Sequence, residues 1–133
     1  MQIYPCWQDI VMERDMDLVR DLLLWIAAGK QFDGHHLVEA TKPEDFGAAG
    51  HSLDEVHYHL VLLIDEGFLK GAYTVGGAAV SKLTWKGHEL LADIRDPDIW
   101  SKTKERAKGL TSVGIALVWE IAKAEIRKKL GLP

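Results

Sequence analysis

Six histidines make a metal site the first chemistry to test in these 133 residues. A zinc site needs several ligands on one side of an element, for example two histidines four residues apart on a helix. The adjacent histidines at 35–36 diverge on an extended chain, and His57 and His59 lie about 200° apart around an expected helix. The spacing therefore predicts no metal site and no cofactor, and a site assembled in space from His51, His88 and others is the alternative.

Nucleophilic residues give no catalytic pattern. Ser81 and Thr84 lack the sharp Gly-x-Ser-x-Gly turn that presents a nucleophile. Cys6 is the single cysteine and has no evident helix N-terminus to activate its thiol. The pair Gly76–Gly77 is too short to hold a phosphate and lacks the Lys-Ser/Thr that would follow. We predict that the protein is not an enzyme.

Charge is unevenly distributed along the chain. Residues 1–94 hold 7 Lys/Arg and 15 Asp/Glu, whereas residues 95–133 hold 9 Lys/Arg and 5 Asp/Glu. A nucleic-acid binder that is basic throughout does not have this pattern. An anionic partner is expected to meet the C-terminal third or the hairpin, and the simpler alternative is a solvated surface that is merely asymmetric. The candidate phosphate contacts are Lys82, Lys86, Lys102, Lys104, Arg106 and Lys108.

Five tryptophans are a rich supply for a chain of this length. Trp25 and Trp85 fall at positions that predict burial in the core. Trp119 falls off the main apolar stripe of its helix; a place in the core is the favoured interpretation, and an exposed interface anchor is the alternative. We take His57, Tyr58 and Trp119 as the candidate protein-interaction surface.

Periodicity and turn residues predict a mostly helical chain with one hairpin. Ser52 and Glu55 form a capping box that begins the clearest helix, and Gly67 ends it. Gly76–Gly77 marks a tight turn between two strands. The expected elements are helices at 15–28, 52–66, 88–95, 98–108 and 112–130, a helical turn at 43–46, and strands at 36–38, 72–75 and 80–85.

Length predicts one domain, residues 12–133, preceded by an arm at residues 1–11. Such a chain buries enough surface to need no disulfide, and a lone cysteine fits a reducing compartment. The longest uninterrupted apolar run has seven residues, which is too short for a membrane span, and no secretory signal is visible. We expect a cytoplasmic protein without a membrane partner.

The order of helix, short strand, capped helix, hairpin and helix resembles a winged helix. The chain also resembles a family of small bacterial and phage proteins described as a domain of unknown function. The resemblance is carried by Tyr58 to Leu60, Leu83 to Leu91, and Asp96 to Lys108 with Trp100. The resemblance covers about residues 12–132. It implies an α+β, mostly helical fold, a winged helix-turn-helix with appended C-terminal helices, and it implies no activity.

The winged-helix resemblance favours a non-catalytic regulatory module of bacterial or phage origin that binds DNA. DNA reading needs Arg, Lys, Asn or Gln aimed at bases and phosphates. The outward positions of the helix at 52–66 carry none of these residue types, so a protein-interaction module, such as a phage effector acting on a host protein, is the alternative. Those outward positions are Asp54, Glu55, His57, Tyr58, Val61, Leu62 and Asp65.

The last helix, at 112–130, is long for a body of this size. Val118, Trp119 and Ile126 extend its apolar surface beyond what one packing partner covers, so we expect a homodimer formed through it. The alternative is that the first helix and the N-terminal arm, with Tyr4 and Trp7, cover this surface. The main stripe is expected to be Val113, Ala116, Leu117, Ile121, Ala124 and Leu130.

Overall fold

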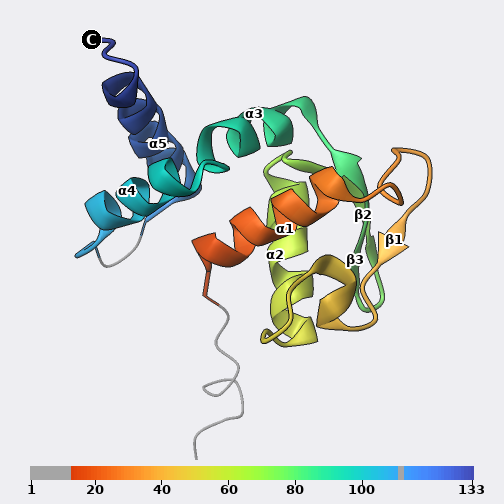
Figure 1. Ribbon diagram of the computed structural model, residues 1–133. Helices are drawn as coiled ribbons and strands as arrows, with labels where there is room; N and C mark the ends of the chain where they lie inside the picture. The colour runs from red at the N-terminus through yellow and green to blue at the C-terminus, as the bar shows by residue number, and fades with distance from the viewer. Residues whose placement is uncertain (1–12, 111–112) are drawn as a thin grey trace, which may run out of the picture.

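Five α-helices, a short 3₁₀ helix and a three-stranded antiparallel sheet make up the computed structural model, which describes residues 13–110 and 113–133 (Figure 1). The arm predicted at residues 1–11, with Tyr4, Cys6 and Trp7, lies outside the described residues. In chain order the elements are α1 Met16–Ala28, β1 Val38–Glu39, η2 Pro43–Phe46, α2 Leu53–Asp65, β2 Leu69–Thr74, β3 Gly77–Leu83, α3 Trp85–Ile94, α4 Pro97–Ala107 and α5 Ile115–Lys129. The predicted α+β, mostly helical class is confirmed.

Helices α1 to α4 begin where the sequence places a capping side chain, whereas α5 begins after Gly114 without one. The Asp15 carboxylate accepts a hydrogen bond from the backbone N–H of Leu18 at the start of α1. Ser52 and Glu55 form the reciprocal capping box at the start of α2. Each such bond satisfies a backbone N–H that the helix itself leaves without a partner. These two helices therefore lie within one or two residues of their predicted bounds.

The hairpin lies a few residues earlier than predicted. Strand β2 pairs with β3 from Leu69 opposite Leu83 to Thr74 opposite Gly77, and β1 pairs with the other edge of β3. Thr84 caps α3 by accepting a hydrogen bond from the N–H of Gly87, so Trp85 is the first residue of a helix rather than the end of a strand. The strand prediction missed this cap because Thr84 and Trp85 are also good strand formers.

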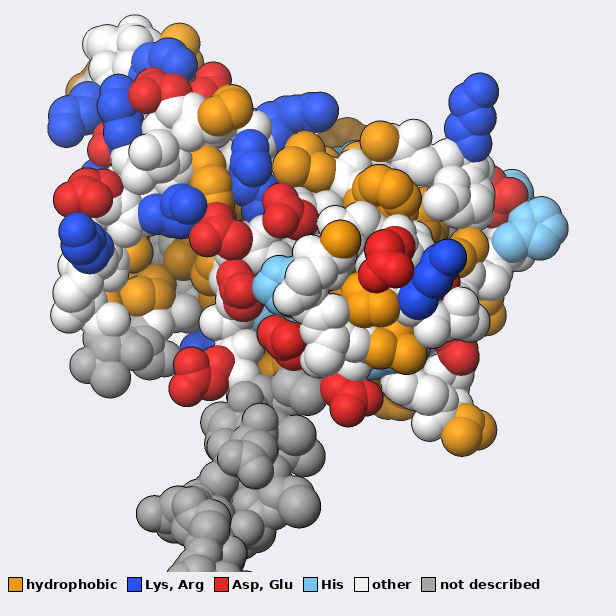
Figure 2. Space-filling view, turned by 60° about the horizontal axis from the view of Figure 1, so that its bottom comes forward, with side chains coloured by type: hydrophobic (Ala, Val, Ile, Leu, Met, Phe, Trp, Pro, Cys, Tyr) orange, Lys and Arg blue, Asp and Glu red, His pale blue; other side chains and the backbone are white. Residues whose placement is uncertain are grey.

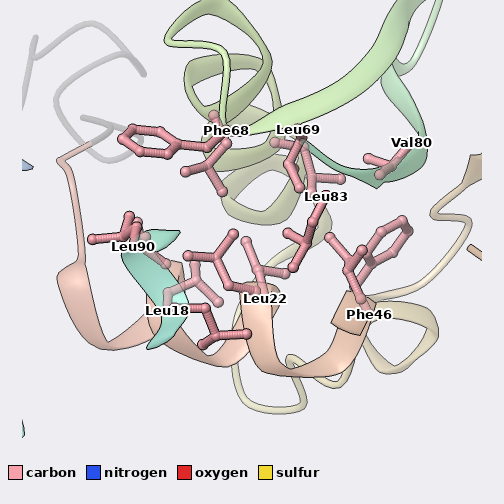
Figure 3. Packing of buried hydrophobic residues seen from close by; sticks show 14 of the residues in the cluster. Leu18, Leu22, Phe46, Phe68, Leu69, Val80, Leu83 and Leu90 are labelled. Carbon is pink, nitrogen blue, oxygen red and sulfur yellow. The ribbon is translucent and has the colours of Figure 1, made fainter. Parts of the chain in front are cut away.

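One apolar core lies between α1, α2, the sheet and α3. Figure 3 shows side chains of α1, η2, β2, β3 and α3 converging from different parts of the chain. The labelled members are Leu18, Leu22, Phe46, Phe68, Leu69, Val80, Leu83 and Leu90, all of which are buried. Burial of this apolar area is the main source of stability and holds α2 against the sheet.

Helices α4 and α5 form a pair at the end of the molecule away from the sheet (Figure 1). The prediction for α5 chose the wrong apolar face as the one that packs against the rest of the protein. Val118 and Ala122 are buried, and Trp119 and Ile126 pack beside them. Leu117, from the predicted stripe, is 45% exposed. No helix in the described part of the chain is long and apolar enough to cross a bilayer.

Candidate interaction surface

The outward face of α2 is acidic and apolar, and we call it the α2 surface. Asp54 and Asp65 are exposed, and Tyr58, Val61 and Leu62 are half-buried between them. The helix contains no Lys or Arg. Its first turn also carries acidic side chains, which the positive end of the helix dipole stabilises. A phosphate backbone approaching this face would meet negative charge and no donor from a basic side chain.

Tyr73 on β2 extends the α2 surface onto the hairpin. Its hydroxyl donates a short hydrogen bond to the carboxylate of Asp65. This hydrogen bond raises the pKa of Tyr73 above its ordinary value, because it stabilises the protonated phenol beside a negative charge. The ring itself is 66% exposed. An exposed tyrosine held in place by a neighbouring carboxylate is a rigid amphipathic contact of the kind enriched at protein interfaces.

A groove of about 250 Å³ adjoins the α2 surface. Leu62 belongs to both, and the groove continues between the start of α1, the end of α2 and the start of α5. Its lining is mostly apolar and consists of Arg14, Met16, Val19, Leu62, Leu63, Glu66, Phe68, Gly114, Ile115 and Ala116. The α2 surface therefore has an adjoining depression that can take an apolar side chain.

His57 does not belong to this surface, contrary to the prediction. It is 6% exposed, and its Nδ1 accepts a hydrogen bond from the N–H of Ala78. Its Nε2 therefore carries the proton and donates to the carbonyl oxygen of Ala40 at 3.0 Å. A Cβ at Gly77 would lie 2.5 Å from Nδ1, so glycine is required for the hairpin to approach the ring. His57 ties α2 to the hairpin and to the chain that follows β1.

His59 is buried in the same way on the side of α2 that faces α1. Its Nε2 accepts a hydrogen bond from the N–H of Asp15, and its Nδ1 donates to the carbonyl oxygen of Glu55. Both ring nitrogens are used, so this histidine connects two helices. Within residues 13–110 and 113–133, no three His, Cys, Asp or Glu side chains lie close enough together to hold a metal ion.

Two of the candidate phosphate contacts lie near the hairpin and differ in their surroundings. The Lys86 amine donates to the carbonyl oxygen of Glu66 at 2.9 Å and lies 4.6 Å from the centre of the Phe68 ring. Lys82 is exposed on β3, directly opposite Lys70 of β2, and neither forms an ion pair with a described residue. Lys86 is thus engaged within the fold, whereas Lys82 and Lys70 form a small basic patch.

The basic residues of α4 are also only partly free. Lys102 pairs with Asp98 at 3.2 Å, and Lys104 pairs with Asp17 of α1 at 3.1 Å. Figure 2 shows the Lys and Arg side chains of this face gathering on the side occupied by α4 and α5, with carboxylates among them. Two candidates from this region have no ion pair with any described residue, namely Arg106 and Lys108.

Two of the tryptophans are placed differently from the prediction. Trp85, predicted in the core, is 82% exposed, and Trp25 is exposed with its Nε1–H bonded to the carbonyl of Asp45. Trp119 donates its Nε1–H to Asp93 at 2.7 Å and packs on Phe68, which agrees with a place in the core rather than with an exposed interface anchor. Trp100 is buried, with its Nε1–H bonded to Asp17. Exposure of an indole depends on which helix lies against it, so spacing within one helix was a poor guide.

Sequence reasoning missed Tyr73 and Trp85 as exposed aromatic residues. Tyr73 lies between Ala72 and Thr74 on a strand whose partner is rich in alanine. The alternation of side chains therefore did not indicate which face of the strand is buried. Thr84 before Trp85 and Gly87 after it form a capping sequence that could have placed Trp85 in the first turn of a helix. A first-turn position leaves a large side chain beside the end of the core rather than in it.

Comparisons with known proteins place the chain in a family without an assigned activity. The family described as "Hypothetical protein (DUF2513)" matches residues 13–114. An uncharacterised protein of Haemophilus influenzae is 28% identical over 125 residues, which cover 90% of this chain and 99% of that protein. No solved structure gives a significant match. The match over residues 13–114 covers most of the chain, which therefore belongs to the family DUF2513.

Proposed function

We propose that this protein is a non-catalytic winged-helix regulatory module that binds another protein through the α2 surface. The element order and the sheet order β1-β3-β2 support the winged helix, with η2 and α2 as the helix-turn-helix and the β2–β3 hairpin as the wing. Fold alone does not assign a partner, so the choice between DNA and protein rests on the surface.

The observation that carries the proposal is the composition of the α2 surface. The helix in the position of a recognition helix presents carboxylates and half-buried apolar side chains and has no basic residue. Base edges and phosphates are read by Arg, Lys, Asn and Gln, and none of these is present there. Tyrosine and aliphatic side chains around an apolar groove are instead the usual centre of a protein interface.

The chemistry of the α2 surface also indicates the kind of protein partner. Asp54 and Asp65 lie at opposite ends of the helix, with Val61 and Leu62 between them. A complementary segment carries apolar side chains for the groove and Lys or Arg at both flanks. Such charge complementarity mainly accelerates association and selects the partner, whereas the buried apolar contacts supply most of the affinity.

DNA binding through the wing is the second candidate. The observation in its favour is the pair Lys70 and Lys82, which lie opposite each other on the wing strands and have no carboxylate partner among described residues. Arg106 and Lys108 likewise form no ion pair within residues 13–110 and 113–133. Contacts between these cations and DNA phosphates do not depend on the DNA sequence, and the affinity that they supply falls steeply as the salt concentration rises.

One set of variants distinguishes protein binding from DNA binding when it is tested by photo-crosslinking in cells and with DNA fragments. A photo-crosslinking amino acid at position 58 is expected to give a discrete protein adduct in cells, and the adduct is lost when Val61→Asp or Asp54→Lys/Asp65→Lys is added. The same label at Asp21, exposed on α1, is the matched control. Mixed genomic DNA fragments at low salt are expected to show no binding. DNA binding that is lost in Lys70→Glu/Lys82→Glu and unaffected by Val61→Asp would overturn the proposal in favour of the second candidate.

A further inference from the structure

We infer that α5 is a dimerisation helix that pairs with α5 of a second copy of this chain, in antiparallel orientation about a two-fold axis. The first residues of α5, Ile115 and Ala116, line the groove beside the α2 surface, but the dimer pairs through residues further along the helix and does not depend on the protein-binding proposal. The second copy occupies one face of α5.

One face of α5 is left without a packing partner in the described chain. The helix packs on α3 and α4 through Val118, Ala122 and Glu125. On the adjoining face of the helix Leu117 is 45% exposed, Ala124 is exposed and Ile121 is half-buried. An exposed leucine alone needs no explanation, but three apolar side chains on one face of a terminal helix form a continuous stripe.

The stripe has the spacing of a two-helix seam. Leu117, Ile121, Ala124 and Lys128 are separated by four, three and four residues, which is the repeat that keeps a seam on one face of paired helices. The long methylene stem of Lys128 can cover apolar surface while its amine stays in water. The seam therefore runs along most of the 15 residues of α5, or about 22 Å.

The order of side chains along the seam selects the antiparallel arrangement. In that register Ile121 lies opposite Ala124 of the second copy, and Leu117 lies opposite the stem of Lys128, so that large side chains meet small or flexible ones. A parallel pair would place Lys128 beside Lys128 and Ala124 beside Ala124, which combines repulsion with a gap. Antiparallel helices also align their dipoles favourably.

The charges beside the seam are self-complementary only in the antiparallel register. Glu120 and Arg127 are seven residues apart on the same flank of α5, and both are exposed. Antiparallel pairing brings Glu120 of each chain to Arg127 of the other, which gives two ion pairs about the two-fold axis. This match between a face and its own rotated copy is the property required of an isologous interface.

The size of the seam predicts a weak dimer. Two helices of about 22 Å bury less than the roughly 1,200 Å² typical of stable complexes, so we expect a dissociation constant on the order of 10–100 µM. Light scattering of the full chain at about 200 µM is expected to give a mass approaching twice the 14.9 kDa of one chain, falling to 14.9 kDa on dilution. A mass of one chain at every concentration would overturn the inference.

A charge swap tests the register. Glu120→Arg and Arg127→Glu are each expected to weaken dimerisation at least tenfold, because each places like charges together twice. The double variant Glu120→Arg/Arg127→Glu is expected to return to within about threefold of the unaltered chain. Asp21→Arg, at an exposed residue of α1, makes the same charge change as Glu120→Arg and should have no effect. Failure of the double variant to recover would exclude this pairing.

Disulfide trapping tests the orientation independently. In a Cys6→Ser background, Ile121→Cys and Ala124→Cys are prepared as two separately tagged proteins, mixed and oxidised. Antiparallel pairing predicts mainly the mixed 121–124 disulfide, whereas parallel pairing predicts disulfides between identical positions. Leu117→Glu, which changes an exposed residue and should leave the circular dichroism unchanged, is expected to abolish trapping. Equal trapping with and without Leu117→Glu would overturn the inference.

Discussion

The buried polar side chains of α2 and of α5 differ in whether they have hydrogen-bond partners. In α2, His57 and His59 each use both ring nitrogens for hydrogen bonds to backbone groups. In α5, Glu125 is 5% exposed, and its Oε2 has no hydrogen-bond partner in the described part of the chain. The only other such buried side-chain atom among the described residues is Oγ1 of Thr74.

The histidines of α2 are therefore expected to stabilise the fold, whereas the Glu125 carboxyl is expected to destabilise it. A buried group that satisfies backbone donors and acceptors is costly to remove, because its partners stay buried without replacement. A buried carboxyl without a partner already carries its desolvation cost, so an apolar side chain of similar size is an improvement. We therefore expect substitutions in α2 and α5 to change stability with opposite signs.

The largest expected effect is at His57. His57→Leu leaves the N–H of Ala78 and the carbonyl of Ala40 buried without partners, and we expect the free energy of unfolding to fall by about 2–4 kcal/mol. Urea denaturation followed by circular dichroism measures it. The control His35→Leu, at an exposed histidine, is expected to stay within about 0.5 kcal/mol. Equal small losses for both variants would contradict a structural role of His57.

The opposite sign is expected at Glu125. Glu125→Met keeps an unbranched side chain and removes the unpartnered carboxyl, so we expect the free energy of unfolding to rise by about 1–2 kcal/mol. Urea denaturation at about 1 µM protein excludes a contribution from self-association. Glu105→Met, at an exposed glutamate of α4, is the matched control and should change little. A loss of stability in Glu125→Met would show that this carboxyl has a partner in solution.

Trp119, which packs in the fold, and Trp85, which is exposed, give the next contrast. Trp119→Phe keeps the ring contact with Phe68 but removes the hydrogen bond to Asp93, and we expect a loss of about 1 kcal/mol. Trp85→Ala removes an indole that is 82% exposed and should cost less than about 0.5 kcal/mol. Thermal unfolding of both variants ranks them. The reverse order would place Trp85, not Trp119, in the core.

The smallest expected effect is at Asp17, which joins the two ends. Burial raises its pKa, but hydrogen bonds from Trp100 and Lys104, together with the charges of Lys104 and Arg20, outweigh this and hold the pKa below its usual value. The folded state thus binds this proton more weakly than the unfolded chain does. The stabilisation is complete above the unfolded pKa of about 4 and is lost as pH falls through the lower folded value.

Asp17→Asn is therefore expected to reduce stability at pH 7 by less than about 1 kcal/mol, since the side chain is 58% exposed. The difference from the unaltered chain should shrink as the pH falls from 7 to 2. Urea denaturation at the two pH values measures it. A difference that persists unchanged at pH 2 would mean that the loss is caused by packing rather than by charge.

Much of the local structure follows from the sequence alone. Ser52 and Glu55 cap α2 as their residue types and spacing predict, and Gly67 ends it with a positive φ of 82°. The absence of Lys and Arg from α2 is equally a property of the sequence. These features depend on residues within about one helical turn of each other, so local hydrogen bonding decides them.

The tertiary structure decided which side chains face solvent and which cations are free. Spacing placed Leu117 and Ile121 on one stripe of α5, but only the positions of α3 and α4 made Val118 and Ala122 the buried face. Lys104 pairs with Asp17 across a sequence separation that no local pattern reveals. Burial and ion pairing depend on elements far apart in the chain, whereas periodicity shows only that a helix has two faces.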